Sequence, residues 1–192
     1  MAESSSSSKL MTLSEHFNNN EYGHMTDKGT THDYIDGYYS HEFTPRKDDE
    51  ITILEIGIWQ GGSLQLWDNW FTNAEITAIE VTKRQWMYKP EHIRVINKSG
   101  YDESTVNMFK DDTFDYIIDD GPHTLNSQLY SIRHWLPKVK NGGKLIIEDI
   151  QSIDSSKNEF DEICNELEIK YDIVDLRENK KRFDDVMVII QK

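Results

Sequence analysis

Two acidic pairs, each placed at the end of an apolar run, are the residues in this sequence best suited to chemistry. Asp119 and Asp120 end the run FDYIIDD, and Glu148 and Asp149 end the run KLIIED. Carboxylates that meet at one point repel each other unless a cation lies among them. Oxygen ligands without a Cys or His cluster favour Mg²⁺, with Mn²⁺ and Ca²⁺ as alternatives. The pairs therefore suggest a metal site, although Asp119 and Asp120 could instead cap the helix that follows.

A histidine stands three residues after Asp120, on the turn that leaves the same run. A neutral imidazole, with an ordinary pKa near 6.5, can accept a proton at physiological pH. If a divalent ion lowers the pKa of a bound hydroxyl, His123 is in place to take that proton. The alternative for His123 is a surface histidine at the start of a helix.

The rest of the sequence alternates between β-rich apolar runs and segments of helix length. Strands are expected at 51–59, 74–81, 92–97, 114–119 and 141–149, the last fed by a tight glycine turn. Helices are expected at 63–71, briefly after residue 81, and at 104–109. Two later helices show apolar stripes, formed by Leu125, Leu129, Ile132 and Leu136 and by Phe160, Ile163, Cys164 and Leu167. Two closing strands, 170–176 and 185–190, are joined by a charged loop that favours a hairpin.

Strands separated by helices predict an α/β fold with a mostly parallel sheet covered on both faces. The closing pair has no intervening helix, so the last strand is expected to insert antiparallel. In open sheets of this kind the ligand binds beyond the carboxyl ends of the strands. The fourth and fifth strands are expected to be neighbours about 4.8 Å apart, which would bring Asp120 beside Glu148 and Asp149.

The first strand leads into a glycine-containing loop, from Glu55 through Gly57 and Gly61 to Ser63. Glycines here let backbone approach a ligand, and the next helix offers free N–H groups to an anion. The loop lacks the ending of a phosphate loop and the full dinucleotide pattern, so a plain strand-to-helix turn is an equal alternative. Glu80 ends the second strand, where an acid can accept both hydroxyls of a ribose; taken alone, a solvent-exposed acid is the favoured interpretation.

Taken together, E-x-G-x-x-x-G after strand one, an acid ending strand two and L-P-K-V-K-N-G-G before strand five resemble the class I S-adenosylmethionine-dependent methyltransferases. The resemblance covers roughly residues 50 to 190 and implies a Rossmann-like, seven-stranded fold. It also implies roles in binding the cofactor. Glu55, Gly57 and Gly61 would line its methionine side, Ser63 would reach its carboxylate, and Glu80 would hold its ribose.

A narrower resemblance is to the metal-dependent sugar O-methyltransferases of the mycinamicin type, a group similar to cephalosporin hydroxylase-like proteins. It rests on T-D-K-G-T-T-H-x-Y at residues 26–34, D-D-G-x-H at 119–123 and I-E-D at 147–149. The chain departs from the group at two positions. Pro122 stands where a serine is usual, and Ser99 stands where the group has an acid after strand three.

The narrower resemblance implies that Asp120, Glu148 and Asp149 bind Mg²⁺ and that His123 is the general base. Asp119 is expected either to cap the helix or to touch the cofactor. The function expected is S-adenosylmethionine-dependent transfer of a methyl group to a sugar hydroxyl of a glycan, nucleotide sugar or glycosylated metabolite. The alternatives are methylation of a non-sugar vicinal diol and a non-catalytic cofactor-binding module.

Composition narrows the partners and the setting. The formal charge of −14, from 35 acidic and 21 basic residues, argues against nucleic acid and anionic membranes as partners. The single cysteine, Cys164, forms no internal disulfide and suggests a reducing compartment, the cytoplasm. No apolar run reaches the roughly 20 residues of a membrane helix. Two forms of assembly stay open, a homo-oligomer and a larger glycan-biosynthesis assembly.

One domain is expected over residues 10–192, after a disordered leader at 1–9. Its core would be 51–192, and residues 10–50 would form a helical lid segment. In that segment His32, Tyr34, Tyr38 and Tyr39 either cover the ligands or pack as a helix. Trp59 and Trp67 are expected in the core or at its rim.

Overall fold

A seven-stranded sheet forms the centre of the computed structural model, which describes residues 11–20, 25–82, 87–88 and 90–192. The strands are β1 (Glu50–Ile56), β2 (Asn73–Ile79), β3 (Arg94–Ile96), β4 (Phe114–Asp119), β5 (Val139–Ile147), β6 (Asp172–Asp175) and β7 (Val186–Gln191). Their spatial order is β3-β2-β1-β4-β5-β7-β6. The first five are parallel, and β7 runs antiparallel to both β5 and β6. The predicted fold class, including the antiparallel last strand, is confirmed.

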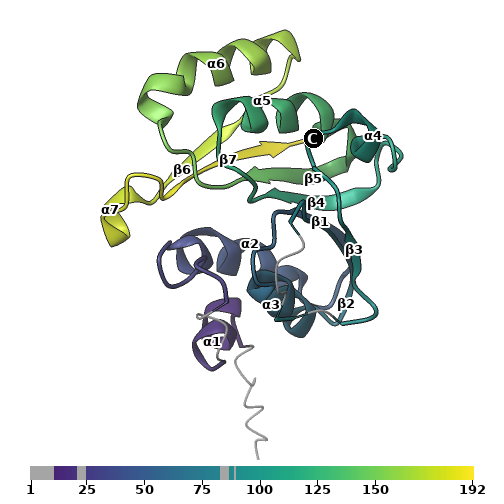
Figure 1. Ribbon diagram of the computed structural model, residues 1–192. Helices are drawn as coiled ribbons and strands as arrows, with labels where there is room; N and C mark the ends of the chain where they lie inside the picture. The colour runs from purple at the N-terminus through teal and green to yellow at the C-terminus, as the bar shows by residue number, and fades with distance from the viewer. Residues whose placement is uncertain (1–10, 21–24, 83–86, 89) are drawn as a thin grey trace, which may run out of the picture.

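Helices cover both faces of this sheet (Figure 1). One face carries α1 (Leu13–Asn18), the π-helix η1 (Ile35–Tyr39), α2 (Ser40–Phe43), the 3₁₀ turn η2 (Thr44–Arg46) and α3 (Gly62–Trp70). The other carries α4 (Glu103–Val106), α5 (Leu125–His134), the 3₁₀ turn η3 (Leu136–Lys138) and α6 (Ile153–Glu166). The short helix α7 (Arg177–Lys180) projects from the body between β6 and β7.

Alternation along the strands divides the core into two apolar clusters, because successive side chains of a strand point to opposite faces. Ile53 packs with the N-terminal helices and α3, whereas its neighbour Leu54 packs with α5 and α6. In β4, Ile117 and Ile118 separate in the same way. Burial on both faces explains why these strands read as continuous apolar runs.

Three details differ from the sequence-based expectations. β1 ends at Ile56 rather than at residue 59, because Gly57 turns the chain with φ = 83°. The expected glycine turn before β5 is wrong: the strand starts at Val139 and continues through Gly142, where its register against β4 shifts. The connection between β6 and β7 contains α7 and is not a simple hairpin loop. The expected leader and most of the expected helix after residue 81 lie outside the described residues.

The sheet register places the two acidic pairs next to each other. Asp119 pairs with Ile147 of β5 and with Ile56 of β1. Just beyond, Glu148 N–H donates to the Asp119 carbonyl at 3.0 Å, and Asp120 N–H donates to the Ile56 carbonyl at 2.8 Å. The prediction that strands four and five are adjacent in the sheet is therefore confirmed.

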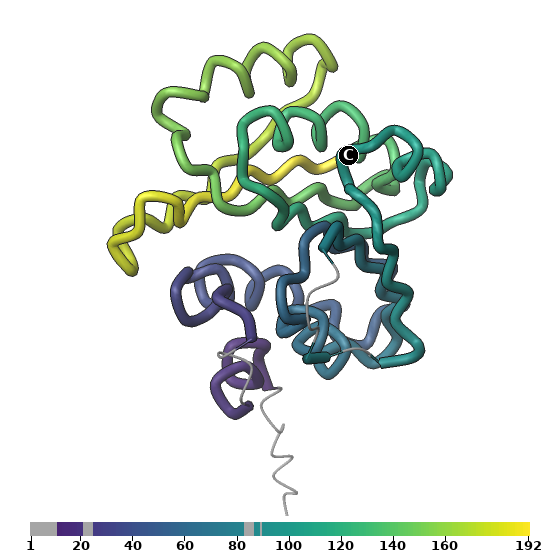
Figure 2. The backbone as a smooth tube through the Cα atoms, viewed as in Figure 1, coloured from purple at the N-terminus to yellow at the C-terminus, as the bar shows by residue number. Residues whose placement is uncertain are grey.

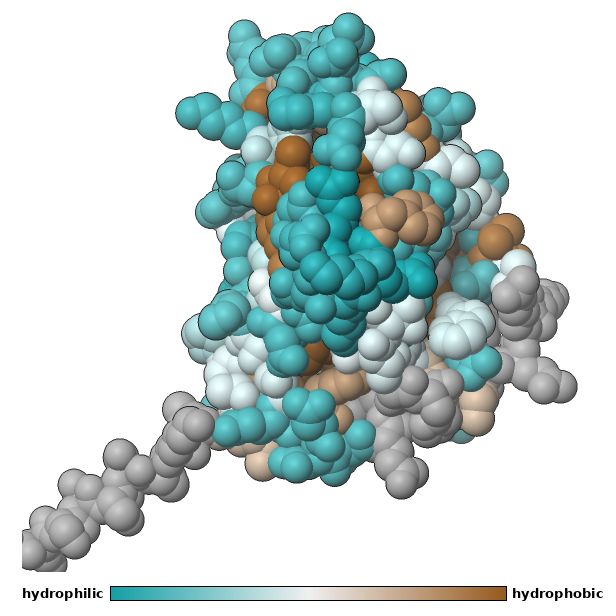
Figure 3. Space-filling view, turned by 90° about the vertical axis from the view of Figure 1, so that its left-hand side faces the viewer, coloured by the Kyte–Doolittle hydropathy of each residue, from teal (hydrophilic) through white to brown (hydrophobic). Residues whose placement is uncertain are grey.

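The N-terminal segment before β1 lies along the edge of the sheet from which these acids emerge (Figure 2). It packs through buried rings, including Tyr34, Tyr39 and Phe43. The face of the molecule that carries α7 is mostly hydrophilic, with apolar side chains showing only in small patches (Figure 3). In the part of the chain that the structure describes, every helix is too short or too polar to span a membrane.

Two glycines with the same backbone strain test how closely the first loop approaches β4. A Cβ on Gly57 (φ = 83°) would lie 2.0 Å from the Asp120 carbonyl oxygen, whereas one on Gly142 (φ = 81°) would meet nothing within 4 Å. Gly142→Ala should lower the free energy of unfolding by about 1–2 kcal/mol. Gly57→Ala should cost roughly 1–3 kcal/mol more, because backbone must move. Equal losses in urea unfolding of the two variants would contradict the close approach.

Candidate active site

A cavity of about 600 Å³ opens at the carboxyl ends of the strands. Its wall includes six of the predicted site residues: Gly57, Ser63, Glu80, Asp120, His123 and Asp149. Met25, Thr26 and Asp27 complete one side, so the N-terminal segment contributes to the wall. Trp59 stands at the rim with 49% of its surface exposed, whereas Trp67 is fully buried.

The loop after β1 and the end of β2 form one side of the cavity. Gly61 has φ = 88° and is the N-cap of α3, so the free N–H groups of this helix begin at the loop. Glu80 fixes the loop from β2, since it accepts the Ile58 N–H at 3.2 Å and the Thr82 N–H at 2.8 Å. The Thr82 hydroxyl is a third donor at 2.7 Å, so about one of the four acceptor positions of the carboxylate is left for a ligand. Gly61 is not one of the described residues that line the cavity.

Asp119 is buried, and side chains of the chain itself satisfy both its oxygens. Tyr101 donates to Oδ1, and the Ser131 hydroxyl donates to Oδ2 at 2.5 Å. Burial raises the pKa of Asp119 to about 6, against the opposing effect of these hydrogen bonds. Helix α5 is capped by Thr124, whose side chain accepts the Ser127 N–H. The capping alternative for the acidic pair is therefore wrong, and contact of Asp119 with a cofactor stays a prediction.

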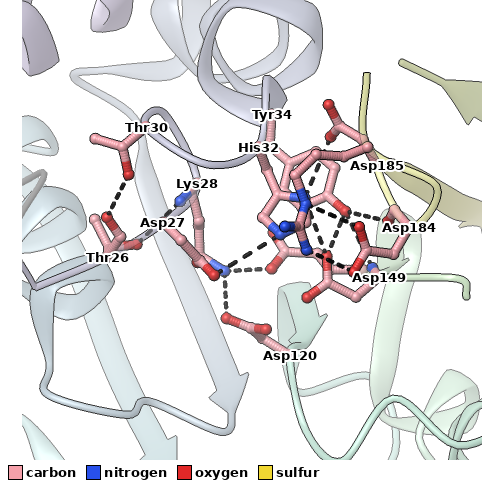
Figure 4. Close-up of polar contacts among 12 residues, drawn as sticks. Thr26, Asp27, Lys28, Thr30, His32, Tyr34, Asp120, Asp149, Asp184 and Asp185 are labelled. Atoms are coloured by element: carbon pink, nitrogen blue, oxygen red, sulfur yellow. Dashed lines mark hydrogen bonds and ion pairs between the residues drawn. The ribbon is translucent and has the colours of Figure 1, made fainter. Parts of the chain in front are cut away.

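A lysine ammonium lies among three carboxylates at the base of the site (Figure 4). Lys28 reaches from the N-terminal segment and is 1% exposed; its Nζ is 2.7 Å from Asp120 Oδ2, 3.5 Å from Glu55 Oε1 and bonded to Glu148 Oε2. Burial alone would lower the pKa of Lys28, but the charges of Asp120, Glu148 and Glu55 hold it well above its usual value. The expectation that a cation separates the acids is met here in part by a side chain.

Glu55 and Glu148 are buried and are not among the described residues that line the cavity. Trp67 Nε1 donates to Glu55 Oε2 at 3.1 Å, and the Tyr39 hydroxyl donates to Glu148 Oε1 at 2.5 Å. Burial raises the pKa of Glu55 to about 7 and raises that of Glu148 strongly, in both cases against the lowering effect of Lys28. The predicted cofactor role of Glu55 and metal role of Glu148 stay predictions.

Asp120, His123 and Asp149 face one another at the mouth of this cluster. Each offers one ligand atom, and the three atoms lie within 4.8 Å of one another. Asp120 gives Oδ2 to Lys28 and turns Oδ1 toward His123 Nε2, at 3.9 Å. Asp149 accepts from the Tyr34 hydroxyl at Oδ1 and places Oδ2 3.5 Å from the same nitrogen. His123 and Asp149 both have left-handed backbones, with φ of 55° and 54°, a strain that often marks functional positions.

The cluster gathers four carboxyl groups around one lysine ammonium. One ammonium faces Glu55, Asp120 and Glu148, and Asp149 lies beside them. Burial and the charge of Asp120 raise the pKa of Asp149. A divalent ion held by the outward oxygens of Asp120 and Asp149 would offset this charge. The donor set, two carboxylates with a histidine beside them, fits such an ion.

Sequence reasoning assigned no role to Lys28, although this residue belongs to the T-D-K-G motif. The available signal was the charge itself, because buried acids need compensation from any cation the fold can supply. Sequence spacing alone could not show that a residue 92 positions from Asp120 would supply it.

A family model described as a methyltransferase domain matches residues 54–150, which is just over half of the 192 residues. The chain belongs to this methyltransferase family.

Curated relatives of this methyltransferase domain are named as O-methyltransferases. It is 28% identical over 136 residues to the 8-demethyl-8-(2-methoxy-alpha-L-rhamnosyl)-tetracenomycin-C 3'-O-methyltransferase of Streptomyces olivaceus, covering 66% of this chain and 35% of the relative. It is 27% identical over 122 residues to the mycinamicin VI 2''-O-methyltransferase of Micromonospora griseorubida, covering 59% and 30%. The chain thus spans about a third of the length of these relatives.

Solved structures share the fold of the methyltransferase domain. MycE methyltransferase from the mycinamycin pathway, in complex with Mg and SAH, superposes with a TM-score of 0.71 at 21% identity, covering 96% of this chain and 55% of that one. The SAH-bound Podospora anserina methyltransferase PaMTH1 gives 0.58 at 15%, covering 93% and 86%. These likenesses confirm the Rossmann-like methyltransferase fold.

Removing the Lys28 ammonium should destabilise the methyltransferase domain. Lys28→Met leaves the buried acids without their ammonium, and should lower the free energy of unfolding by about 3–5 kcal/mol. Lys157→Met is the matched control, since Lys157 pairs with Asp161 on the exposed surface of α6. Urea unfolding in excess chelator measures both. A Lys28 variant as stable as the control would show that the ammonium is dispensable.

Stability of the metal-free protein should fall as pH rises from about 5 to 7.5. Glu55 has an ordinary pKa of 4.5 and a folded pKa of about 7, so the folded state binds its proton more tightly than the unfolded chain. The stabilisation is complete below the unfolded pKa and is lost as pH rises through 7. Glu55→Gln should remove roughly 2 kcal/mol of this decline. The measurement is urea unfolding of wild type and Glu55→Gln at several pH values in excess chelator. If the free energy of unfolding falls equally with pH in both proteins, the pKa of Glu55 is not raised.

Proposed function

We propose that this chain is an S-adenosylmethionine-dependent O-methyltransferase that uses Mg²⁺ and transfers the methyl group to a sugar hydroxyl. The observation that carries the proposal is that a single cavity joins a glycine loop and Glu80 on one side to Asp120, His123 and Asp149 on the other. The relatives' names, which specify O-methylation on sugar-bearing compounds, support the acceptor class.

The loop side of the cavity suits the cofactor. Gly57 brings backbone close to the ligand, Ser63 and the N–H groups at the start of α3 suit its carboxylate, and Glu80 suits its ribose hydroxyls. Structures of MycE contain SAH and Mg, which supports the same pair of groups here. When bound, S-adenosylmethionine supplies an electrophilic methyl group, and the divalent ion supplies charge that lowers the pKa of an acceptor hydroxyl.

The acidic side of the cavity suits the metal and the acceptor. Asp120 and Asp149 would hold the ion through the oxygens that Lys28 and Tyr34 leave facing the cavity, with Glu148 as the third ligand implied by the family resemblance. Lys28 and Tyr39 already bond to Glu148, but each of its oxygens keeps a second acceptor position.

His123 is proposed as the general base. Its Nε2 lies beside the outward oxygens of both aspartates, so an acceptor hydroxyl held there is within reach of the nitrogen. The proton that the hydroxyl loses passes to Nε2 as the oxygen gains the methyl group. His123 has a left-handed backbone, and its imidazole lies beside Asp120 and Asp149, which follow β4 and β5.

Turnover with a panel of glycosylated acceptors and nucleotide sugars tests the function. Asp120→Asn should abolish Mg²⁺-dependent methyl transfer while leaving S-adenosylhomocysteine binding, measured by calorimetry, within a few-fold of wild type. Asp154→Asn, on the exposed start of α6, is the control and should leave both unchanged. Full activity of Asp120→Asn, or of wild type in excess chelator, would rule out the metal-dependent mechanism.

A second measurement separates a base from a ligand at position 123. His123→Ala should lower turnover by about 10²–10⁴-fold, the usual contribution of a general base. Affinity for Mn²⁺, measured by electron paramagnetic resonance, should change little. If Mn²⁺ binding is lost with turnover, His123 is a metal ligand and the proposed base is incorrect.

A further inference from the structure

The hydroxyl of Tyr34 contacts Asp149 at two points. It lies 2.5 Å from Oδ1, the nearer of two acceptors for its single proton, since the Asp184 carbonyl lies 3.1 Å away. Its oxygen accepts the N–H of Asp149 at 3.2 Å. Asp149 lies two residues after the end of β5 and has a left-handed backbone, with φ = 54°. One hydroxyl therefore holds both the backbone turn and the side-chain orientation of this aspartate.

Fixing one oxygen of Asp149 determines where the other points. Oδ2 is the oxygen that lies 3.5 Å from His123 Nε2, and Asp149 completes the group with Asp120. A carboxylate free to rotate would pay conformational entropy on binding an ion, and a held one would not. Tyr34 is not among the described residues that line the cavity, so its contact with the site runs through Asp149.

Tyr34 is itself held rigidly. Its ring is 1% exposed and stacks on His32, with centroids 4.8 Å apart and planes at 14° (Figure 4). The Asp33 N–H donates to Asp185 at 3.2 Å. From outside, Lys180 Nζ donates to the carbonyls of Gly29 at 2.6 Å and His32 at 2.7 Å. The connection between β6 and β7 therefore fixes the loop that carries Tyr34.

A second hydroxyl of the same segment makes a comparable contact with an acid of the site. Neighbouring Tyr39 makes an analogous bond to Glu148 Oε1, so this segment supplies donors to two of the three acids expected to bind metal.

We propose that Tyr34 is a positioning residue for the divalent ion, which orients Asp149 for coordination through Oδ2. The proposal rests on the metal-dependent function proposed above. It gives the N-terminal segment a second role besides packing, because the segment supplies donors that hold the acids behind the ion.

The same segment offers a matched control. Tyr38 is four residues from Tyr34 and carries a hydroxyl that is buried and has no hydrogen-bond partner among the described residues. Tyr38→Phe removes the same atom from the same segment without touching the acids. Tyr34→Phe removes the hydroxyl and keeps the ring that stacks on His32.

Mn²⁺ titration monitored by electron paramagnetic resonance, with S-adenosylhomocysteine affinity measured in parallel, tests the proposal without turnover. Tyr34→Phe should weaken Mn²⁺ binding by about 10–100-fold, the usual effect of losing such a partner, and leave S-adenosylhomocysteine affinity within a few-fold. Tyr38→Phe should match wild type in both. Lys180→Met removes the hydrogen bonds from outside to the loop that carries Tyr34. It should also weaken Mn²⁺ binding, by a smaller factor.

Two results would overturn the proposal in distinguishable ways. If wild type binds Mn²⁺ and folded Tyr34→Phe binds it equally well, Tyr34 does not position the ligand although the metal function stands. If wild type itself shows no saturable Mn²⁺ binding, the metal-dependent function is wrong and the positioning role falls with it. If Tyr34→Phe does not fold, the Lys180→Met variant decides instead. An Mn²⁺ affinity of that variant equal to that of wild type would overturn the proposal.

Discussion

The structure depends on the compensation of negative charge where β1, β4 and β5 end. Glu55, Asp120, Glu148 and Asp149 meet there because parallel neighbouring strands deliver their carboxyl ends to the same edge. Water does not solvate the buried members, so burial raises the pKa of Glu55 and Glu148, and a nearby cation opposes that shift. Lys28 provides one positive charge. One oxygen each of Asp120 and Asp149 faces His123 at the cavity, and the proposed divalent ion would be held there.

This constraint explains why the segment before β1 belongs to the site. Lys28 alone would not stay buried, but the segment is held by rings that pack against the sheet and by α7 from the other side. Tyr34 and Tyr39 use the same packing to place their hydroxyls on Asp149 and Glu148. Core packing and the orientation of the acids are therefore achieved by the same side chains. The expectation that residues 10–50 form a lid stays a prediction, with Met25, Thr26 and Asp27 as the part that lines the cavity.

The sequence allowed the sheet to be predicted well, because its signals are local. FDYIID is β4 to the residue, and the buried runs mark the other parallel strands closely. Asp120, His123 and Asp149 could be brought together because their strands were expected to be neighbours. Contacts across long sequence separations were out of reach: nothing in the spacing of Lys28 or Tyr34 shows that they reach β4 and β5. The prediction of a glycine turn before β5 was wrong because Gly142 lies within the strand, and a glycine suits a register shift as well as a tight turn.

The most direct test of this account is a crystal structure of the chain grown with Mn²⁺ and S-adenosylhomocysteine, with anomalous diffraction used to locate manganese. The account predicts one ion per chain at coordination distance, about 2.0–2.2 Å, from oxygens of both Asp120 and Asp149, with Lys28 still beneath them. Absence of an anomalous peak at this edge of the sheet, or an ion bound elsewhere, would contradict it.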